Sequence, residues 1–158
     1  MDDSYLCIDI GTSSIKAVEK DAGGRTVRWG ILERRGGSFH TNIQPLDVAD
    51  AARHLKILIE KMYLGALGIK APIEAVASVP AFLLLFAIAD VPDSHRIPAA
   101  PETFRAFGVQ LESGKYLLIG LPDEITEKYV KIFTLAGLEL VHMESESAAL
   151  ARVFGKSN

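Results

Sequence analysis

One stretch near the start of the chain, Tyr5–Lys16, constrains the fold more than any other. An apolar run of strand length ends in Asp9, a glycine and three hydroxyl residues, and a second alternating run begins at Ile15. This pattern predicts a β-hairpin whose tight turn is formed by residues 11–14. Glycine admits a close ligand, consecutive backbone N–H groups can bind an anion, and the hydroxyl groups add donors. The turn is therefore a candidate anion-binding site.

Side chains of the same hairpin offer groups that a phosphate and a metal ion would need. Lys16 can place a positive charge on a phosphate oxygen, and Asp9 can hold a hydrated Mg²⁺ ion. An ordinary hairpin uses the same residue types, with the aspartate bonded to turn N–H groups and the lysine solvated. The residues alone leave both interpretations open, although no G-x-x-x-x-G-K-[ST] motif of a P-loop occurs. The residues that would cradle phosphate are Gly11, Thr12, Ser13 and Ser14.

Composition indicates a globular protein. The chain has 158 residues, of which 49% are hydrophobic, and a net charge of −3, so we expect a buried core and no nucleic-acid partner. The acidic start, Met1–Asp3, lacks the form of a signal peptide, and the apolar run Ala81–Val91 is shorter than the ~20 residues that span a bilayer. The lone cysteine, Cys7, is expected to pack in the core. These features predict a cytoplasmic protein with no direct membrane insertion.

Hydrophobic patterns predict a defined order of elements up to residue 80. Three antiparallel strands come first, followed by a helix that Asp47 can cap and a strand that Pro80 stops. The helix carries an apolar stripe, so it must pack on the sheet. This βββαβ order is the opening of a ribonuclease-H-like fold. The strands are expected at Tyr5–Ile10, Ile15–Lys20, Thr26–Glu33 and Glu74–Val79, and the helix at Leu46–Ala66.

The second half of the chain mixes predicted strands and helices. A strand precedes a hairpin turning at Glu112–Gly114, and a helix that Gly137 ends comes next. A further strand and an alanine-rich helix complete the pattern. These strands are expected at Leu83–Val91, Arg105–Leu111, Lys115–Leu121 and Leu138–Met143. The first helix is expected to open at Pro122, Asp123 and Glu124 and to end before Gly137, and the second is expected at Glu146–Phe154.

Several motifs carry a resemblance to a known family. The D-x-G-T-S-S-I-K pattern of Asp9–Lys16 resembles the first phosphate hairpin of the actin-like ATPase and sugar-kinase superfamily. Four later segments occur in the order found in PilM-like type IV pilus assembly proteins, and the cell-division relative FtsA is a weaker match. They are A-S-V-P-A at Ala77–Ala81, A-D-V-P at Ala89–Pro92, Y-L-L-I-G-L-P at Tyr116–Pro122 and E-S-E-S-A-A-L-A-R at Glu144–Arg152.

This resemblance implies an α/β fold: a ribonuclease-H-like (actin-like ATPase) lobe with a small α+β insertion. The lobe would comprise residues 1–84 and 137–158, and the insertion residues 85–136. Leu138–Met143 should then lie in the same sheet as Tyr5–Ile10. The family continues beyond the position of Asn158 into a second lobe, so this chain is expected to be a first lobe alone or a natural half-length relative.

The resemblance also implies ATP and Mg²⁺ as cofactors, with Asp9 holding the metal through water. Glu146 matches a position where actin-like ATPases orient the attacking water, although an acidic residue there also suits the first turn of a helix. The second phosphate hairpin and the adenosine motif belong to the second lobe. We therefore expect this half-length chain not to hydrolyse ATP by itself and not to bind it tightly.

Two functions of different classes remain open. The first is a cytoplasmic scaffold of a type IV pilus or related secretion machine, which reaches the inner membrane by binding the cytoplasmic tail of a PilN-like protein. The second is a nucleotide-dependent ATPase or kinase whose second lobe is supplied by another chain, and a homo-oligomer is left open. The small sheet of the insertion should expose an edge beside Leu83–Val91, where an apolar groove would accept an extended peptide. Its aromatic residues, which fit either such a groove or a plain core, are Phe82, Phe86, Phe104 and Phe107.

Overall fold

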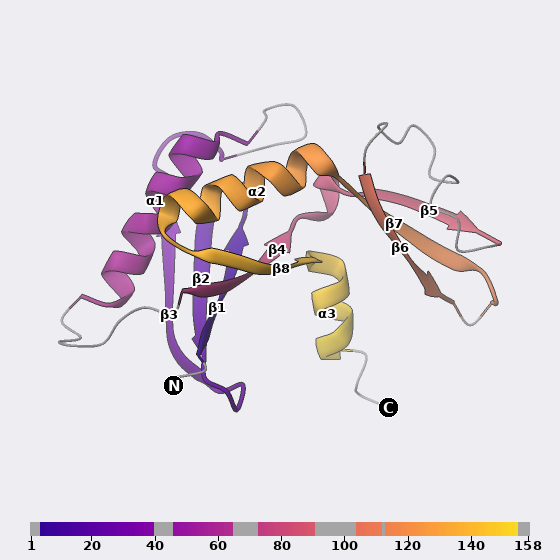
Figure 1. The fold of residues 1–158 in the computed structure, drawn as a ribbon, viewed down its shortest axis with the longest axis horizontal. Coiled ribbons are helices and arrows are strands. Elements are labelled where there is room, and N and C mark those ends of the chain that lie inside the picture. Colours follow the sequence, from indigo (N-terminus) through magenta and orange to yellow (C-terminus); the bar gives the residue numbers. More distant parts are fainter. Residues whose placement is uncertain (1–3, 40–45, 65–72, 91–103, 112, 155–158) are drawn as a thin grey trace. The chain divides into compact units, whose positions relative to one another are not determined.

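The structure, a computed structural model, describes residues 4–39, 46–64, 73–90, 104–111 and 113–154. The chain forms two compact units, one made of residues 1–80 and 128–158 and the other of residues 81–127. The first unit contains a mixed sheet with helices, and the second contains a small antiparallel sheet (Figure 1).

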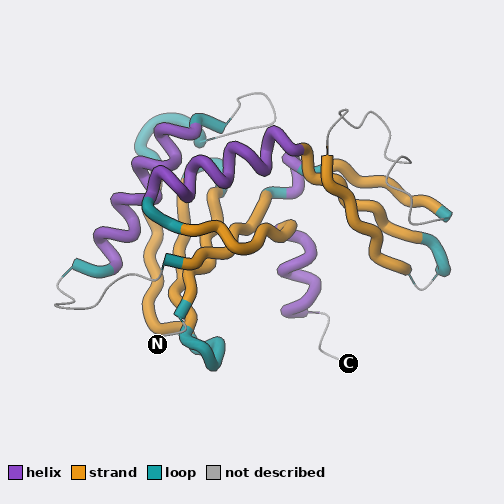
Figure 2. Tube along the Cα trace, in the orientation of Figure 1, coloured by secondary structure: helices purple, strands orange, loops and turns teal. Residues whose placement is uncertain are grey.

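A five-stranded sheet with the order β3-β2-β1-β4-β8 forms the base of the first unit (Figure 2). The strands β1, β2 and β3 are antiparallel, whereas β4 runs parallel to β1 and β8 runs parallel to β4. The predicted return of segment 138–143 to the sheet of the N-terminal hairpin is therefore confirmed. The strands are β1 (Tyr5–Ile10), β2 (Ser14–Lys20), β3 (Thr26–Glu33), β4 (Glu74–Val79) and β8 (Glu139–Ser145).

The central strand β1 alternates between the core and the opposite face of the sheet. Leu6, Ile8 and Ile10 are at most 2% exposed, and each such burial contributes roughly 1.5–3 kcal/mol. Since successive side chains of a strand point to opposite faces, Cys7 and Asp9 lie on the other side. The expectation that Cys7 packs in the core is therefore wrong, because Cys7 is half-buried on this second face.

Helix α1 (Val48–Met62) packs against β3 and β2, as its apolar stripe requires. Asp47 caps it by accepting a hydrogen bond of 3.0 Å from the N–H of Asp50, which confirms the predicted cap. The close approach depends on Gly30, where a Cβ atom would lie 2.9 Å from side-chain carbons of Leu58 and Met62. The helix is shorter than the predicted range, and residues 65 and 66 of that range lie outside the described residues.

Helix α2 (Asp123–Ala136) buries Tyr129, Ile132 and Phe133 and ends at the predicted glycine. Gly137 has a φ of 82°, and the N–H of Leu138 donates to the carbonyl oxygen of Phe133 at 2.9 Å. This is a Schellman motif, in which the residue after the glycine closes the helix end. Leu138 therefore belongs to the helix terminus, and β8 begins one residue later than predicted.

The second unit is a three-stranded antiparallel sheet with the order β5-β7-β6. A short 3-10 turn, Ala81–Leu83, precedes it, and the N–H of Leu84 donates to the carbonyl oxygen of Ala81 at 3.1 Å. The predicted strand at Leu83–Val91 is consequently shorter, while the predicted hairpin is confirmed to within one residue. The strands are β5 (Leu85–Ala89), β6 (Phe104–Gln110) and β7 (Tyr116–Pro122).

Helix α3 (Glu146–Phe154) follows β8 directly and has the predicted bounds. Ser145 caps it, since its hydroxyl accepts a hydrogen bond of 3.0 Å from the N–H of Ala148. Among the helices of the described residues, none combines the length and the apolar character needed to cross a bilayer. The borders expected for the insertion, after residues 84 and 136, lie later than the observed ones, because the 3-10 turn belongs to the second unit and the buried part of α2 to the first.

Candidate functional site

The N-terminal hairpin closes through a tight turn at the predicted residues. The N–H of Gly11 donates to the carbonyl oxygen of Ser14 at 2.9 Å. A Cβ atom at position 11 would lie 3.2 Å from that same oxygen, so a larger residue would push the turn open. The expected glycine turn is therefore present, and it places the hydroxyl residues 12–14 beside the ends of β1 and β2.

Asp9 and Lys16 stand directly opposite each other on β1 and β2. Lys16 Nζ lies 2.7 Å from Asp9 Oδ2, and the two side chains are 50% and 28% exposed. Within the described residues the carboxylate bonds to Lys16 and not to the N–H groups of the turn. The two charged groups expected to serve a phosphate and a metal ion thus form one accessible ion pair.

The carbonyl groups of the turn are held by the segment that follows β3. The N–H of Arg34 donates to Ser13 O at 2.9 Å, and the N–H of Phe39 donates to Thr12 O at 2.7 Å. The N–H groups of Thr12 and Ser13 make no hydrogen bond within the part of the chain that the structure describes. Successive N–H groups with no protein partner are the donors that an anion-binding turn requires.

A cavity of about 560 Å³ opens on the face of the sheet that carries Asp9. Ser78 pairs with Asp9 on the neighbouring strand β4, and Glu144 pairs with Ser78 on β8, so polar groups from three parallel strands meet here. The floor is apolar and includes Cys7, whose thiol pKa is raised by burial more than nearby Lys20 lowers it. The cavity therefore joins an apolar floor to a polar rim, an arrangement typical of small-molecule sites.

Tyr129 of α2 is a buried side chain within electrostatic range of the first hairpin and of the start of α3. Its ring is fully buried, and its hydroxyl has no hydrogen-bond partner within the described residues. Burial raises the pKa of this phenol first, and the negative charges of Asp9 and then Glu146 raise it further. The structure thus brings Glu146, the first residue of α3, and Asp9 into electrostatic reach of one buried donor.

Neither Tyr129, which lies among the apolar side chains that α2 buries, nor Ser78 was predicted from the sequence as a site residue. The one signal for Tyr129 in the sequence was its hydroxyl, since the other large side chains on the same face of the helix, such as Ile132 and Phe133, are hydrocarbons. Ser78 and Glu144 are the penultimate residues of β4 and β8. Because ligands bind at the carboxyl ends of parallel strands, these positions were a signal for site residues. Among the described residues, no three His, Cys, Asp or Glu side chains gather as a metal site.

No protein-family model matches the sequence, and no curated protein matches it. Solved structures do match. The PilM-PilN type IV pilus biogenesis complex aligns with a TM-score of 0.70 and 14% identity over 94% of this chain and 49% of the other. The cytoplasmic domain of EpsL, an inner membrane component of the type II secretion system of Vibrio cholerae, aligns with a TM-score of 0.58 and 10% identity over 89% of this chain and 55% of the other.

The ethanolamine utilization protein EutJ from Carboxydothermus hydrogenoformans is a third match, with a TM-score of 0.56 and 19% identity over 96% of this chain and 40% of the other. This chain therefore spans about half the length of the structures that it matches. Identities this low show a shared fold alone. The sheet order agrees with the fold class expected from the βββαβ order of elements and from the family resemblance. The chain has the α/β fold of an actin-like ATPase lobe, similar to that of PilM.

Proposed function

We propose that the chain is a cytoplasmic scaffold module of a type IV pilus or related secretion assembly, and that its small sheet binds the cytoplasmic tail of a PilN-like inner-membrane partner. The observation that carries this proposal is the edge strand β5, whose outward side chains are apolar and exposed. The likeness to the PilM-PilN complex and to the cytoplasmic domain of EpsL supports it.

Strand β5 has two different faces. Leu85, Ala87 and Ala89 pack with Leu118 of β7 in the small core of the second unit. The alternate residues Phe86 and Ile88 are 42% and 65% exposed. They oppose Ile119, which is buried, and Leu117 of β7, so the exposed apolar side chains of this face belong to the edge strand β5.

An extended peptide fits this edge better than a helix does. Within the described residues β5 pairs with β7 alone, which leaves the backbone groups of its outer edge available to another strand. Strand addition there would give main-chain hydrogen bonds, while apolar side chains of the peptide would contact Phe86, Ile88 and the half-exposed Phe82. The side chains of Phe104 and Phe107 lie outside the described part, and the groove expected beside β5 remains a prediction.

A pair of matched substitutions tests the peptide site. Ile88→Lys places a charge on the exposed face of β5, whereas Ile31→Lys makes the same change at a 53%-exposed position of β3 in the other sheet. We expect Ile88→Lys to weaken binding of a PilN-type tail peptide about tenfold or more, because burial of an isoleucine is lost. Ile31→Lys should bind like the parent, with circular dichroism showing that both variants fold. A parent that binds no such peptide would refute the proposal.

A second candidate function, nucleotide binding, is favoured by the turn of the first hairpin. The N–H groups of Thr12 and Ser13, which bond to no group among the described residues, offer donors to a phosphate, and Lys16 offers a charge. One carboxylate, Asp9, fits a hydrated Mg²⁺ whose remaining ligands are water and phosphate oxygens. Lys16 would have to leave Asp9 for the phosphate, and Glu146 would orient a water molecule. A second lobe from another chain would complete such an ATPase or kinase.

A further inference from the structure

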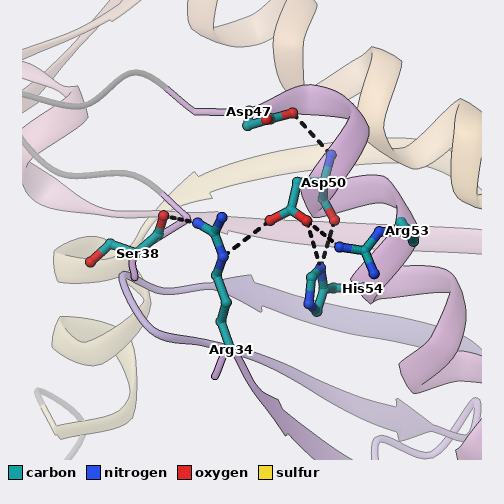
Figure 3. Close-up of polar contacts among 6 residues, drawn as sticks. All are labelled: Arg34, Ser38, Asp47, Asp50, Arg53 and His54. Carbon is teal, nitrogen blue, oxygen red and sulfur yellow. Dashed lines mark hydrogen bonds and ion pairs between the residues drawn. The ribbon is translucent and has the colours of Figure 1, made fainter. Parts of the chain in front are cut away.

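A cluster of charged side chains lies between the first hairpin and the start of α1. Arg34 stands between the carbonyl oxygen of Ser38, to which its guanidinium donates, and the carboxylate of Asp50 (Figure 3). The distance from Arg34 Nε to Asp50 Oδ2 is 3.2 Å, and the two side chains are only 23% and 13% exposed. Partly buried pairs of this kind are screened by solvent less than surface pairs.

Asp50 is in turn fixed within the first turn of α1. Its N–H donates to the capping carboxylate of Asp47, and its own carboxylate is also contacted by Arg53 and by His54, whose Nδ1 lies 3.3 Å from Oδ1. A carboxylate near a helix N-terminus is favoured by the helix dipole. Asp50 is therefore a rigid anchor for Arg34.

Residues 34–39, within which the side chain of Arg34 bonds to Ser38 O, contain the two N–H donors that bond to the hairpin turn. The guanidinium of Arg34 covers the ring of Phe39 at 5.4 Å, and His54 of α1 packs edge-to-face on that fully buried ring at 5.0 Å. The backbone N–H groups of Arg34 and Phe39 are the donors to Ser13 O and Thr12 O. Asp50 and His54 of α1 thus contact the side chains of Arg34 and Phe39, and the backbone of these two residues bonds to the turn.

The hydrogen bonds to the turn carbonyl groups also determine where the neighbouring N–H groups of the turn point. In a planar trans peptide the C=O of one residue and the N–H of the next point in opposite directions. Because the carbonyl group of Thr12 is directed to segment 34–39, the N–H group of Ser13, one of the two donors that make no hydrogen bond within the described residues, is directed away from it. The carbonyl group of Ser13 orients the N–H group of Ser14 in the same way. The orientation of these donors therefore depends on a segment anchored by α1.

We propose that Asp50 is a positioning residue for the hairpin turn, acting through Arg34 and Phe39 to keep the turn N–H groups oriented for a phosphate. The inference rests on the proposed phosphate-binding role of the hairpin. Asp50 itself touches no ligand. Its effect on the ligand passes through two main-chain hydrogen bonds, so the effect is on donor orientation and not on charge at the site.

Asp50→Asn and Asp47→Ala form a matched pair for testing this proposal. Both substitutions disturb the first turn of α1, but only Asp50→Asn weakens the contact to Arg34. We expect ¹⁵N relaxation of the ligand-free protein to show clearly more motion at the Thr12–Ser14 amides in Asp50→Asn than in Asp47→Ala, which loses the cap but keeps the carboxylate that contacts Arg34. Affinity for Mg-pyrophosphate, followed by shifts of the same amides, should fall about fivefold in Asp50→Asn, since oriented donors are lost. Arg34→Lys, which lacks the planar fork, should behave like Asp50→Asn.

Each other outcome has a definite meaning. Equal motion of the turn in Asp50→Asn and Asp47→Ala would reduce the effect to helix stability and overturn the proposal. Unchanged motion and affinity in Asp50→Asn would also overturn it. If the parent protein shows no amide shift with Mg-pyrophosphate, the phosphate-binding function fails, while the ligand-free relaxation still decides whether α1 controls the turn.

Discussion

Lys16 Nζ lies 2.7 Å from Asp9 Oδ2, across the two strands that carry the glycine turn. The pair is partly exposed, so its contribution to stability is small, about 0–1 kcal/mol. We therefore expect the pair to matter for ligand binding, because it places two charges beside the N–H groups of the turn. This separation of stability from binding can be measured.

Replacing Lys16 with methionine should leave stability nearly unchanged and remove phosphate binding. The free energy of unfolding in urea should change by less than ~1 kcal/mol, because an exposed ion pair is screened by solvent. Shifts of the Thr12–Ser14 amides on addition of millimolar Mg-ATP should disappear. Lys20→Met is the control and should bind like the parent: Lys20 lies on the same strand as Lys16, but its Nζ donates to Thr26 of β3. Undiminished shifts in Lys16→Met would contradict a phosphate role for this lysine.

The isolated chain should bind Mg-ATP weakly and should not hydrolyse it. Three or four hydrogen bonds from the turn, each worth ~1 kcal/mol net, amount to about millimolar affinity at best. Isothermal titration calorimetry and a phosphate-release assay measure the two quantities. A micromolar dissociation constant would show that this estimate is wrong and that a second copy or another surface completes the site.

Two tyrosines should respond in opposite ways to removal of the hydroxyl group. The hydroxyl of Tyr63 donates to Glu19 Oε2 at 2.7 Å, and Glu19 is 5% exposed, so Tyr63→Phe should destabilise the fold by about 1.5 kcal/mol. The buried hydroxyl of Tyr129 has no such partner within the described residues, so Tyr129→Phe should be neutral or stabilising. Urea unfolding of both variants checks this. A loss of stability in Tyr129→Phe as large as that in Tyr63→Phe would mean that its hydroxyl is bonded in solution.

The Cys7 thiol should react slowly with alkylating reagents at pH 8 while the protein is folded. Burial raises the pKa of this thiol above its ordinary value, and only the thiolate reacts. The rate with iodoacetamide should therefore keep rising with pH beyond the point where a free cysteine levels off. Protein unfolded in urea provides the control, and it should react faster at pH 8. Equal rates in the folded and unfolded states would contradict the raised pKa.

Local patterns determined the elements of this protein closely. Strands Thr26–Glu33 and Glu74–Val79 and helix α3 have the bounds that alternation, glycine, proline and an acidic first turn predict. These signals act between residues that are neighbours in sequence, so they can be read without a structure. The hairpin turn and its candidate residues, from Asp9 to Lys16, are of the same kind.

Only the tertiary structure decided which groups meet around that turn. Tyr129 of α2 comes into electrostatic reach of Asp9 of β1 and Glu146 of α3 only in the folded first unit. Asp50 reaches the turn through Arg34 because α1 packs on β3. Cys7 lies on the open face and not in the core because the sheet buries only one side of β1 there. Each of these contacts joins residues far apart in sequence, and its geometry depends on how helices cover a twisted sheet, which no local pattern encodes.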